Sequence, residues 1–340
     1  MQRAIPFSVL ELALLKKEDT AADAYRRSLE LARHAENQGY KRFWLAEHHN
    51  MPWVGSSAPT ILMGYIAQGT RRIRVGSGGI MLPNHSPLVV AEQIGTLESL
   101  YPGRIDLGFG RAPGTDQRTA ASLRRGRLET VQEFPQDLEE LQGYFSEENL
   151  DSPVRAFPAE GLPVPFYLLG SSMDSARLAA AKAMPYVFAS HFAPTYFQQA
   201  ASYYRRHFRA YSPGSRPYLI ACINVVAAES QNEAEFLNSS FYQMALGIIR
   251  GRSVPLAAPV ASMDALWTAQ EAAAIRHMTT YSFVGDFDRV KNGLAAFVRE
   301  HRPDELMISS SIYDQEKRLT SYALAAQAIQ SLSGSLQPKV

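Results

Sequence analysis

The sequence contains one cysteine, almost no net charge and no long hydrophobic run. Cys222 is alone among 340 residues, so the chain can form neither an internal disulfide nor a cysteine-based metal centre. The 34 basic and 33 acidic residues leave a formal net charge of +1, which gives no electrostatic reason to expect nucleic acid or an anionic membrane as a partner. No stretch reaches the roughly 20 apolar residues of a membrane helix. These absences favour a cytoplasmic protein that acts on a small molecule.

Two motifs are also missing, and each absence argues against one class of protein. No GxGxxG opens the first predicted helix, which argues against an open dinucleotide-binding sheet. Neither HExxH nor an HxH spacing occurs, so we expect no metal ion and rank a metal-dependent hydrolase last among the alternatives. A hydrophobic content of 46% with 20% charged residues is that of a globular chain with a large core.

The sequence does have a repeated alternation of strand and helix patterns. The predicted strands are 5–10, 42–46, 73–79, 104–109, 166–169, 186–190, 218–227 and 305–309. The helices that follow them begin near residues 20, 58, 88, 136, 173, 196, 232 and 319. Eight such units predict an α/β fold, a closed (β/α)₈ TIM barrel, with residues 1–340 forming a single domain. A doubly wound open sheet is the alternative.

One long interruption follows the seventh unit, and two helices are unusually apolar. Residues 251–280, before a helix starting near Asp286, carry few periodic signals, so we expect an insertion that acts as a lid. The helix 58–69 has hardly a charge, and the helix starting at Leu88 is similar. An outer barrel helix should be polar on its solvent face. We therefore expect a homodimer that covers these two helices, unless loops of the same chain cover them.

The carboxyl ends of the second and third strands carry unusual residues, at the end of a barrel where active sites lie. Glu47 and His48 belong to a Glu-His-His-Asn cluster that is hard to explain as an ordinary strand end. Gly78 and Gly79 sit inside the third strand, where glycine costs stability. They indicate either a tight bend at the rim or the close approach of a flat ring.

The ends of the fourth and fifth strands carry residues that could bind an anion. Arg111 follows the fourth strand among small residues, which suits an anion but equally a surface ion pair. The turn Gly170, Ser171 and Ser172, with Ser175 in the helix after it, either cradles a phosphate or is an ordinary serine N-cap. His191 directly follows the sixth strand, a position that suggests a role in the pocket.

Taken together, these strand ends resemble the bacterial luciferase-like flavin monooxygenase family and, within it, the YhbW-type subgroup. The resemblance spans nearly the whole chain and is carried by residues 44–49, 75–83, 103–111, 169–172, 284–286 and 304–307. It departs from the family's luciferases at two places. Gly110 stands where luciferase has a reactive cysteine, and Gly170 replaces an acidic residue of the phosphate loop. The first departure argues against light emission.

The resemblance implies an enzyme that uses reduced FMN to transfer one oxygen atom of O₂ to a small organic substrate. It implies that His48 and Glu47 are the catalytic residues, with His48 moving a proton near the flavin and Glu47 as the neighbouring carboxylate. It also implies that Gly78 and Gly79 form a non-proline cis peptide against the ring. Arg111, Gly170, Ser171, Ser172 and Ser175 match the phosphate region. A separate NAD(P)H-dependent reductase supplies reduced FMN in the family. A hydride-transferring reductase that uses a deazaflavin or NAD(P)H, and a flavin-binding protein without turnover, are the alternatives.

Overall fold

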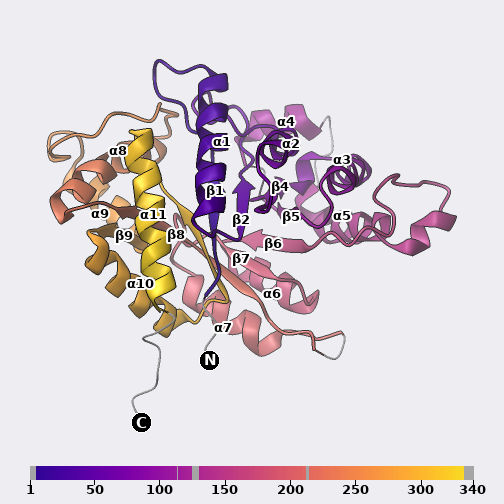
Figure 1. Ribbon diagram of the computed structural model, residues 1–340. Helices are drawn as coiled ribbons and strands as arrows, with labels where there is room; N and C mark the ends of the chain where they lie inside the picture. Colours follow the sequence, from indigo (N-terminus) through magenta and orange to yellow (C-terminus); the bar gives the residue numbers. More distant parts are fainter. Residues whose placement is uncertain (1–4, 113, 125–129, 212–213, 333–340) are drawn as a thin grey trace, which may run out of the picture.

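The computed structural model describes residues 5–112, 114–124, 130–211 and 214–332, and these residues form a closed barrel of parallel strands (Figure 1). The barrel strands are β1 (Phe7–Glu11), β2 (Arg42–Leu45), β3 (Arg74–Ser77), β5 (Ile105–Gly110), β6 (Phe166–Gly170), β7 (Tyr186–Phe188), β8 (Leu219–Ala227) and β10 (Glu305–Ser309). β10 pairs with both β1 and β8 and so closes the ring. The predicted TIM barrel is confirmed, and the open sheet is excluded.

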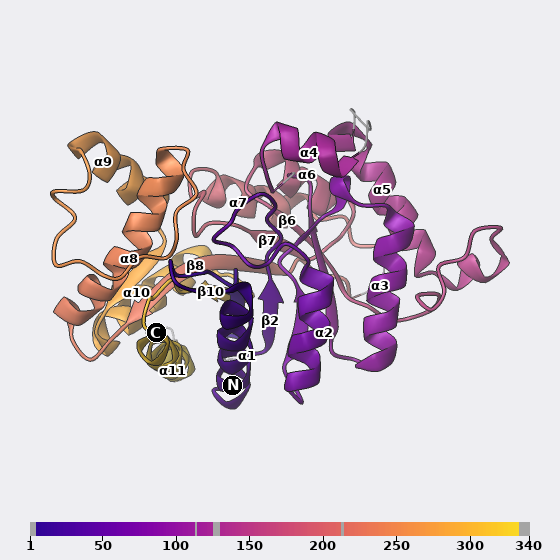
Figure 2. The same cartoon turned by 90° about the horizontal axis from the view of Figure 1, so that it is seen from above.

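Helices surround the barrel, because their apolar faces pack on the outward side chains of the strands (Figure 2). They are α1 (Ala21–Asn37), α2 (Pro59–Gly69), α3 (Pro87–Leu100), α4 (Gln117–Arg124), α5 (Thr130–Tyr144), α6 (Met173–Ala181), α7 (Phe197–His207), α8 (Gln231–Ile249), α9 (Ala269–Met278), α10 (Phe287–His301) and α11 (Gln315–Leu332). Among the described residues, no helix combines the length and the apolar character that a membrane crossing would need.

The third strand is not the continuous strand that the sequence predicts over 73–79. β3 ends at Ser77, the Gly78–Gly79 peptide bond is cis, and β4 (Ile80–Met81) then pairs with the end of β5. The break lets the chain turn at the mouth of the barrel. The cis bond agrees with the feature that the resemblance implies at these two glycines.

The segment 251–280 is more ordered than its sequence pattern suggests. It contains α9, whose N-terminus has a capping box between Thr268 and Glu271, a signal that the sequence reading missed. Met263 and Ile275 of the segment pack against α8 in a small apolar cluster of their own. The strand that follows, β9 (Ser282–Gly285), was also missed, and it pairs with the end of β8 beyond the barrel.

A network of buried charges fills the barrel near the amino ends of its strands. Arg42 of β2 donates to Asp106 of β5 at 2.8 Å and to Glu305 of β10 at 3.1 Å, and all three side chains are buried. Tyr167 of β6 accepts a further bond from Arg42 at 2.7 Å, and Ser8 of β1 donates to Glu305 at 2.5 Å. Arg42 of β2 thus bonds directly to three other strands and is linked to a fourth, β1, through Glu305. Opposite charges and hydrogen bonds offset the cost of burying these charges.

Above this network, Trp44 occupies the barrel interior and explains the glycine at position 76 of β3. Trp44 is fully buried and donates from its indole to Asp106 at 3.0 Å. A Cβ on Gly76 would lie 2.6 Å from the Trp44 ring, so Gly76 makes room for the indole. A Cβ on Gly78 would lie 2.6 Å from the Leu10 side chain, which adds a packing reason to the two readings open from the sequence.

We expect Glu305→Gln to lower the free energy of unfolding by about 3 to 5 kcal/mol, because Arg42 then loses a buried counter-charge. Burial acts to raise the pKa of Glu305, but Arg42 and Lys41 hold it below its ordinary value. The ionised Glu305 therefore contributes its full stabilisation of the fold above about pH 4.3, the pKa of glutamate in an unfolded chain. This contribution is lost as the pH falls through the pKa of Glu305 in the folded protein. Urea denaturation at pH 7 and under acidic conditions measures both effects.

The matched control is Glu139→Gln. Glu139 pairs with Lys182 on the surface, with 63% of its side chain exposed, so its loss should change stability by less than about 1 kcal/mol. If both variants lost the same free energy of unfolding, the buried network would not be more important for stability than a surface ion pair.

Candidate functional site

The loops that follow β2, β3/β4 and β5 are hydrogen-bonded to one another at the mouth of the barrel. The Gly114 carbonyl lies 3.4 Å from both the backbone nitrogen of His49 and the Nδ1 of His48. Thr115 donates its hydroxyl proton to the His49 carbonyl at 2.9 Å. The sequence-predicted residues Glu47 and His48 are thus placed beside the loop that carries Arg111.

Glu47 is fully buried, and both of its carboxylate oxygens accept hydrogen bonds. Its Oε1 lies 2.8 Å from the Nε2 atoms of His49 and His85, and its Oε2 accepts the Met81 backbone N–H at 3.1 Å. Burial acts to raise the pKa of Glu47, but the two histidines and the backbone N–H lower it to about 2. Glu47 therefore stays ionised, and its bonds tie the end of β2 to β4 and to the short 3₁₀ helix Leu82–Asn84, just before His85.

The same three side chains raise the question of a metal. One ligand atom from each of Glu47, His49 and His85 lies within 4.8 Å of the others, a grouping that the missing HExxH and HxH motifs did not reveal. As hydrogen bonds, the two contacts to one oxygen require a proton on each Nε2. A metal would need the Nε2 lone pairs instead. We describe the group by its hydrogen bonds and call it the Glu47 clamp below.

His48 has one nitrogen whose role the backbone fixes. Its Nδ1 lies 3.4 Å from the Gly114 carbonyl, which can only accept, so the proton of the neutral ring is on Nδ1. Its Nε2 is then an acceptor. Burial lowers the pKa of His48, against the raising effects of the Gly114 carbonyl and Glu47, so the ring is neutral near pH 7 and suited to act as a base.

His191 lies at the same mouth, in the loop that follows the end of β7 at Phe188. Its backbone carbonyl accepts a bond of 2.6 Å from the side chain of Asn224, which also donates to Ser282 of β9 at 3.1 Å. Burial and, to a lesser degree, the charge of His48 lower the pKa of His191 to about 4. His48, in the loop after β2, thus contributes to the electrostatics of His191, in the loop after β7. Asn224 and Ser282 are contributors that the sequence reading did not identify.

The residues that are candidates to bind an anion, Arg111 and the turn before α6, also lie close to one another. The guanidinium of Arg111 lies 3.7 Å from Asp174 in the first turn of α6, so it reaches the helix that follows Gly170. Ser172 is the N-cap of that helix and forms a capping box with Ser175. The Ser175 hydroxyl is already engaged, at 2.7 Å from the Ser172 carbonyl and 2.8 Å from the Tyr186 hydroxyl, so it shapes the turn.

Gly170 and Gly79 are fixed by packing. A Cβ on Gly170 would lie 2.2 Å from the Ser175 hydroxyl, and one on Gly79 would lie 2.9 Å from the backbone of Gly108. Any larger residue at Gly170 would displace the capping box. The glycines therefore set the shape of the loops on which the other candidate residues stand.

His49 and His85 are the functional candidates that the sequence reading left out. His49 was quoted only as part of the Glu-His-His-Asn cluster, and His85 lies 38 residues from Glu47 in the chain. Spacing of that length carries no signal, because it is the pairing of β2 with β3 that brings the two strand ends together. The available hint was a histidine two residues before Pro87, which opens a helix after a strand end.

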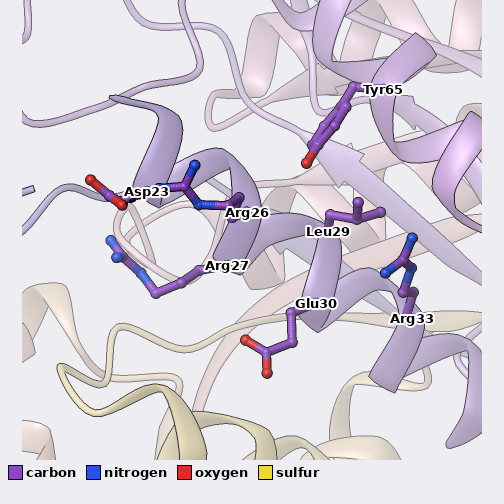
Figure 3. A pocket seen from close by; sticks show the side chains of 7 residues that line it. All are labelled: Asp23, Arg26, Arg27, Leu29, Glu30, Arg33 and Tyr65. Carbon is purple, nitrogen blue, oxygen red and sulfur yellow. Dashed lines mark hydrogen bonds and ion pairs between the residues drawn. The ribbon is translucent and has the colours of Figure 1, made fainter. Parts of the chain in front are cut away.

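An open groove of about 560 Å³ lies elsewhere, on the outside of α1 and α2 (Figure 3). Six of its side chains come from α1 and the seventh, Tyr65, comes from α2. Arg26 and Arg27 are paired with Asp23 and Asp19, so their charges are already compensated. The groove belongs to the outer helical layer and contains none of the candidate site residues.

A closed barrel with acid–base groups at its mouth defines an enzyme, and the comparisons give its family. The chain belongs to the luciferase-like monooxygenases, since the family model of that description matches residues 5–305. The chain is 45% identical over 332 residues to a luciferase-like monooxygenase of Escherichia coli K12, which covers 98% of this chain and 99% of the relative and agrees with the expected subgroup. It is 33% identical to an N-acetyl-S-alkylcysteine monooxygenase of Bacillus subtilis, with 96% and 98% covered.

Solved structures agree with the fold. Apo-MsnO8 has a TM-score of 0.88 and 34% identity, and covers 98% of this chain and 100% of its own. The oxygenating constituent of 3,6-diketocamphane monooxygenase of Pseudomonas putida, solved with FMN, has a TM-score of 0.73 at 16% identity, with 97% and 99% covered. An F420-dependent secondary alcohol dehydrogenase has a TM-score of 0.71 at 14% identity, with 96% and 99% covered. At these lower identities the likeness concerns the fold alone.

The geometry of the Glu47 clamp predicts that its three members are energetically coupled. Glu47→Gln places an NH₂ donor against either the histidine donors or the Met81 N–H, so we expect a loss of about 1 to 3 kcal/mol of unfolding free energy. In a His49→Ala/His85→Ala background, the same substitution should cost much less, because the donors are gone. Urea denaturation of the four proteins gives the coupling free energy, and additive effects would rule out the clamp.

Proposed function

We propose that this enzyme binds FMN, takes it reduced from a separate NAD(P)H-dependent reductase, and uses it with O₂ to oxygenate a small organic substrate. The observation that carries the FMN assignment is the convergence of Arg111 with the N-terminus of α6. Free backbone N–H groups and the positive end of the helix dipole favour a phosphate there, and Arg111 adds a charge. The proposal places the reaction in the cytoplasm, where NAD(P)H is produced.

The residues present fit a flavin phosphate and ring. Gly170, Ser171 and Ser172 form a small-residue turn that leads into α6, and Arg111 is 43% exposed in its side chain, so it remains accessible to a ligand. We propose that the flavin ring lies against Gly78 and Gly79 at the mouth and that His191, in the loop after β7, also lines the cofactor site. When bound, reduced FMN would supply the electrons that activate O₂.

The chain itself would bind, orient and exchange protons. His48 accepts a proton at Nε2, since its Nδ1 proton faces Gly114. Glu47 is engaged by its three donors and therefore acts as a positioning residue that holds His49, His85 and β4 in place. This differs from the catalytic role that the sequence suggested for Glu47.

Asp174 offers a direct test of the phosphate position, because its carboxylate competes with a phosphate for Arg111. We expect the wild type to bind FMN more tightly than riboflavin. In Arg111→Ala, the difference between the two affinities should become smaller. Asp174→Asn should raise the affinity for FMN about threefold, because it removes an exposed negative charge that repels the phosphate. The affinity for riboflavin should stay unchanged. Fluorescence titration of both flavins measures this.

Asp288→Asn, in the first turn of α10, is the control and should leave both affinities unchanged. Equal affinities for FMN and riboflavin in the wild type would overturn the phosphate position. If the protein instead binds and oxidises a reduced deazaflavin without consuming oxygen, it is a hydride-transferring reductase, and bound flavin without any product would indicate a binding protein.

Residues 251–280 remain the proposed lid, within what we take to be one barrel domain. Leu256 donates its backbone N–H to the Leu15 carbonyl after β1 at 2.9 Å, and Thr195 of the loop after β7 lies 3.1 Å from His277 of α9. The segment therefore contacts loops of two other units. Opening over the mouth would break these two contacts and leave the α8 cluster intact.

A homodimer through α2 and α3 is proposed from the residues that these helices leave exposed. Ile61 is 73% and Tyr65 41% exposed on α2, and Val89 of α3 is 45% exposed. The helices lie side by side, bridged by a hydrogen bond from Thr60 to Gln93 at 2.9 Å. No described loop of the same chain covers these side chains, whereas Ile66 is buried against the barrel.

We expect light scattering to give a mass near twice 37.7 kDa, and Ile61→Asp to reduce it to that of one chain, because an interface cannot bury an unpaired carboxylate. Leu150→Asp is the control, since Leu150 is also exposed, at 52%, but belongs to the short 3₁₀ helix Glu147–Asp151 that follows α5. A monomeric wild type would refute the dimer.

A further inference from the structure

The Glu47 clamp gathers two imidazole nitrogens and one carboxylate oxygen at a single point of the barrel mouth. The Oε1 of Glu47 lies 2.8 Å from the Nε2 of His49 and 2.8 Å from the Nε2 of His85, and a ligand atom from each residue lies within 4.8 Å of the other two. The two rings are tilted by 49° with their centroids 6.5 Å apart, so they converge on the carboxylate and do not stack. Two imidazoles and a carboxylate are also a donor set that binds zinc with a fourth position open.

The backbone and the carboxylate of the clamp are held in place by bonds that an ion would not disturb. The His49 carbonyl accepts a hydroxyl bond of 2.9 Å from the loop after β5, and the His85 N–H donates to the Leu82 carbonyl at 3.0 Å. The Oε2 of Glu47 accepts the Met81 N–H at 3.1 Å. A bond of this kind to the second oxygen orients a carboxylate ligand and leaves the first oxygen for the ion.

The outer nitrogens of the two histidines allow the inner ones to give up their protons. The Nδ1 atoms of His49 and His85 have no hydrogen-bond partner among the described residues. The two side chains are 15% and 32% exposed, so water reaches both rings. Each ring can therefore take a proton from water at Nδ1 while it loses the one at Nε2, and it stays neutral with the Nε2 lone pair available.

We propose that Glu47, His49 and His85 form a binding site for one zinc ion, which replaces the two hydrogen bonds of the clamp. Nitrogen donors favour zinc over magnesium and calcium, which prefer ligands that are all oxygen. Zinc lies about 2.1 Å from such ligands, which places tetrahedral neighbours about 3.4 Å apart. Each 2.8 Å contact of the clamp must therefore widen by about 0.6 Å when zinc enters.

The site goes beyond the proposed function, since it needs no flavin. It also reverses the expectation of no metal that the missing HExxH and HxH motifs gave. Two of its ligands follow β2 and the third follows β4, and the pairing of β2 with β3 brings these segments together. The ion would connect the loop after β2 to the segment before α3. His48 lies between two of the ligands in the chain, so zinc would also stiffen the loop that carries it.

The experiment uses the full chain, treated with a chelator and then titrated with metal in the absence of flavin. Cobalt(II) replaces zinc as the spectroscopic probe, and we expect the visible absorption bands of a tetrahedral site to saturate at one equivalent. Zinc should abolish these bands. At zinc concentrations about a hundredfold above Kd, the melting temperature should rise by about 4 °C, because zinc binds the folded state.

Variants of the ligands identify the site. His49→Ala and His85→Ala should each lower the affinity for zinc by about 100-fold or more, since each loses one ligand. His85→Cys should restore zinc binding, because a thiolate is a zinc ligand although a thiol is only a weak hydrogen-bond donor. His207→Ala is the matched control, since His207 is an exposed imidazole on α7, and it should bind zinc like the wild type. Melting in chelator checks that each variant is folded.

The inference is overturned if cobalt gives no such bands. It is equally overturned if zinc binds the two alanine variants as tightly as the wild type, which would assign the metal to surface histidines. Binding that His85→Ala loses and His85→Cys regains supports it, because the hydrogen-bonded clamp alone does not predict this recovery. Failure of FMN to bind would reject the proposed function and leave the zinc site standing, and failure of zinc to bind would leave the FMN proposal as it is.

Discussion

The buried guanidinium of Arg42 is the interaction on which the barrel most depends. It lies between two carboxylates, and through them and their partners it contacts strands from both ends of the chain. A parallel barrel has no edge at which a polar group could reach water, so a charge inside it must be compensated by the protein. The register of β2, β5 and β10 is therefore fixed by electrostatics in the interior as well as by apolar packing outside. The mouth loops stand on strands whose register is set in this way.

The barrel could be predicted because its signal is local and repeated. Apolar strands and amphipathic helices alternate with the right periods, and caps such as the Thr20–Asp23 box mark their limits. β9 and α4 were missed because neither carries a clear periodic pattern. The break after Ser77 was also missed, since a pair of glycines inside an apolar run does not show where hydrogen bonding stops.

The candidate site was predictable in part, for a related reason. Each strand end could be recognised in the sequence, so Glu47, His48, Arg111 and His191 were found from position alone. What each one does depends on partners in other units, and no spacing encodes those. The Glu47 clamp needs His85, and the fixed position of His191 needs Asn224 of β8. Contacts between the ends of neighbouring strands become visible only when the order of the strands is known.

The fit between Trp44 and Gly76 of β3 also constrains how this sequence can change. A smaller residue at Trp44 would leave a void directly below the mouth, which water could enter, and a side chain at Gly76 would collide with the indole. Neither position can vary alone. In relatives of this chain, the two should therefore change together or not at all, and a substitution at one without the other would mark a barrel whose interior has been rebuilt.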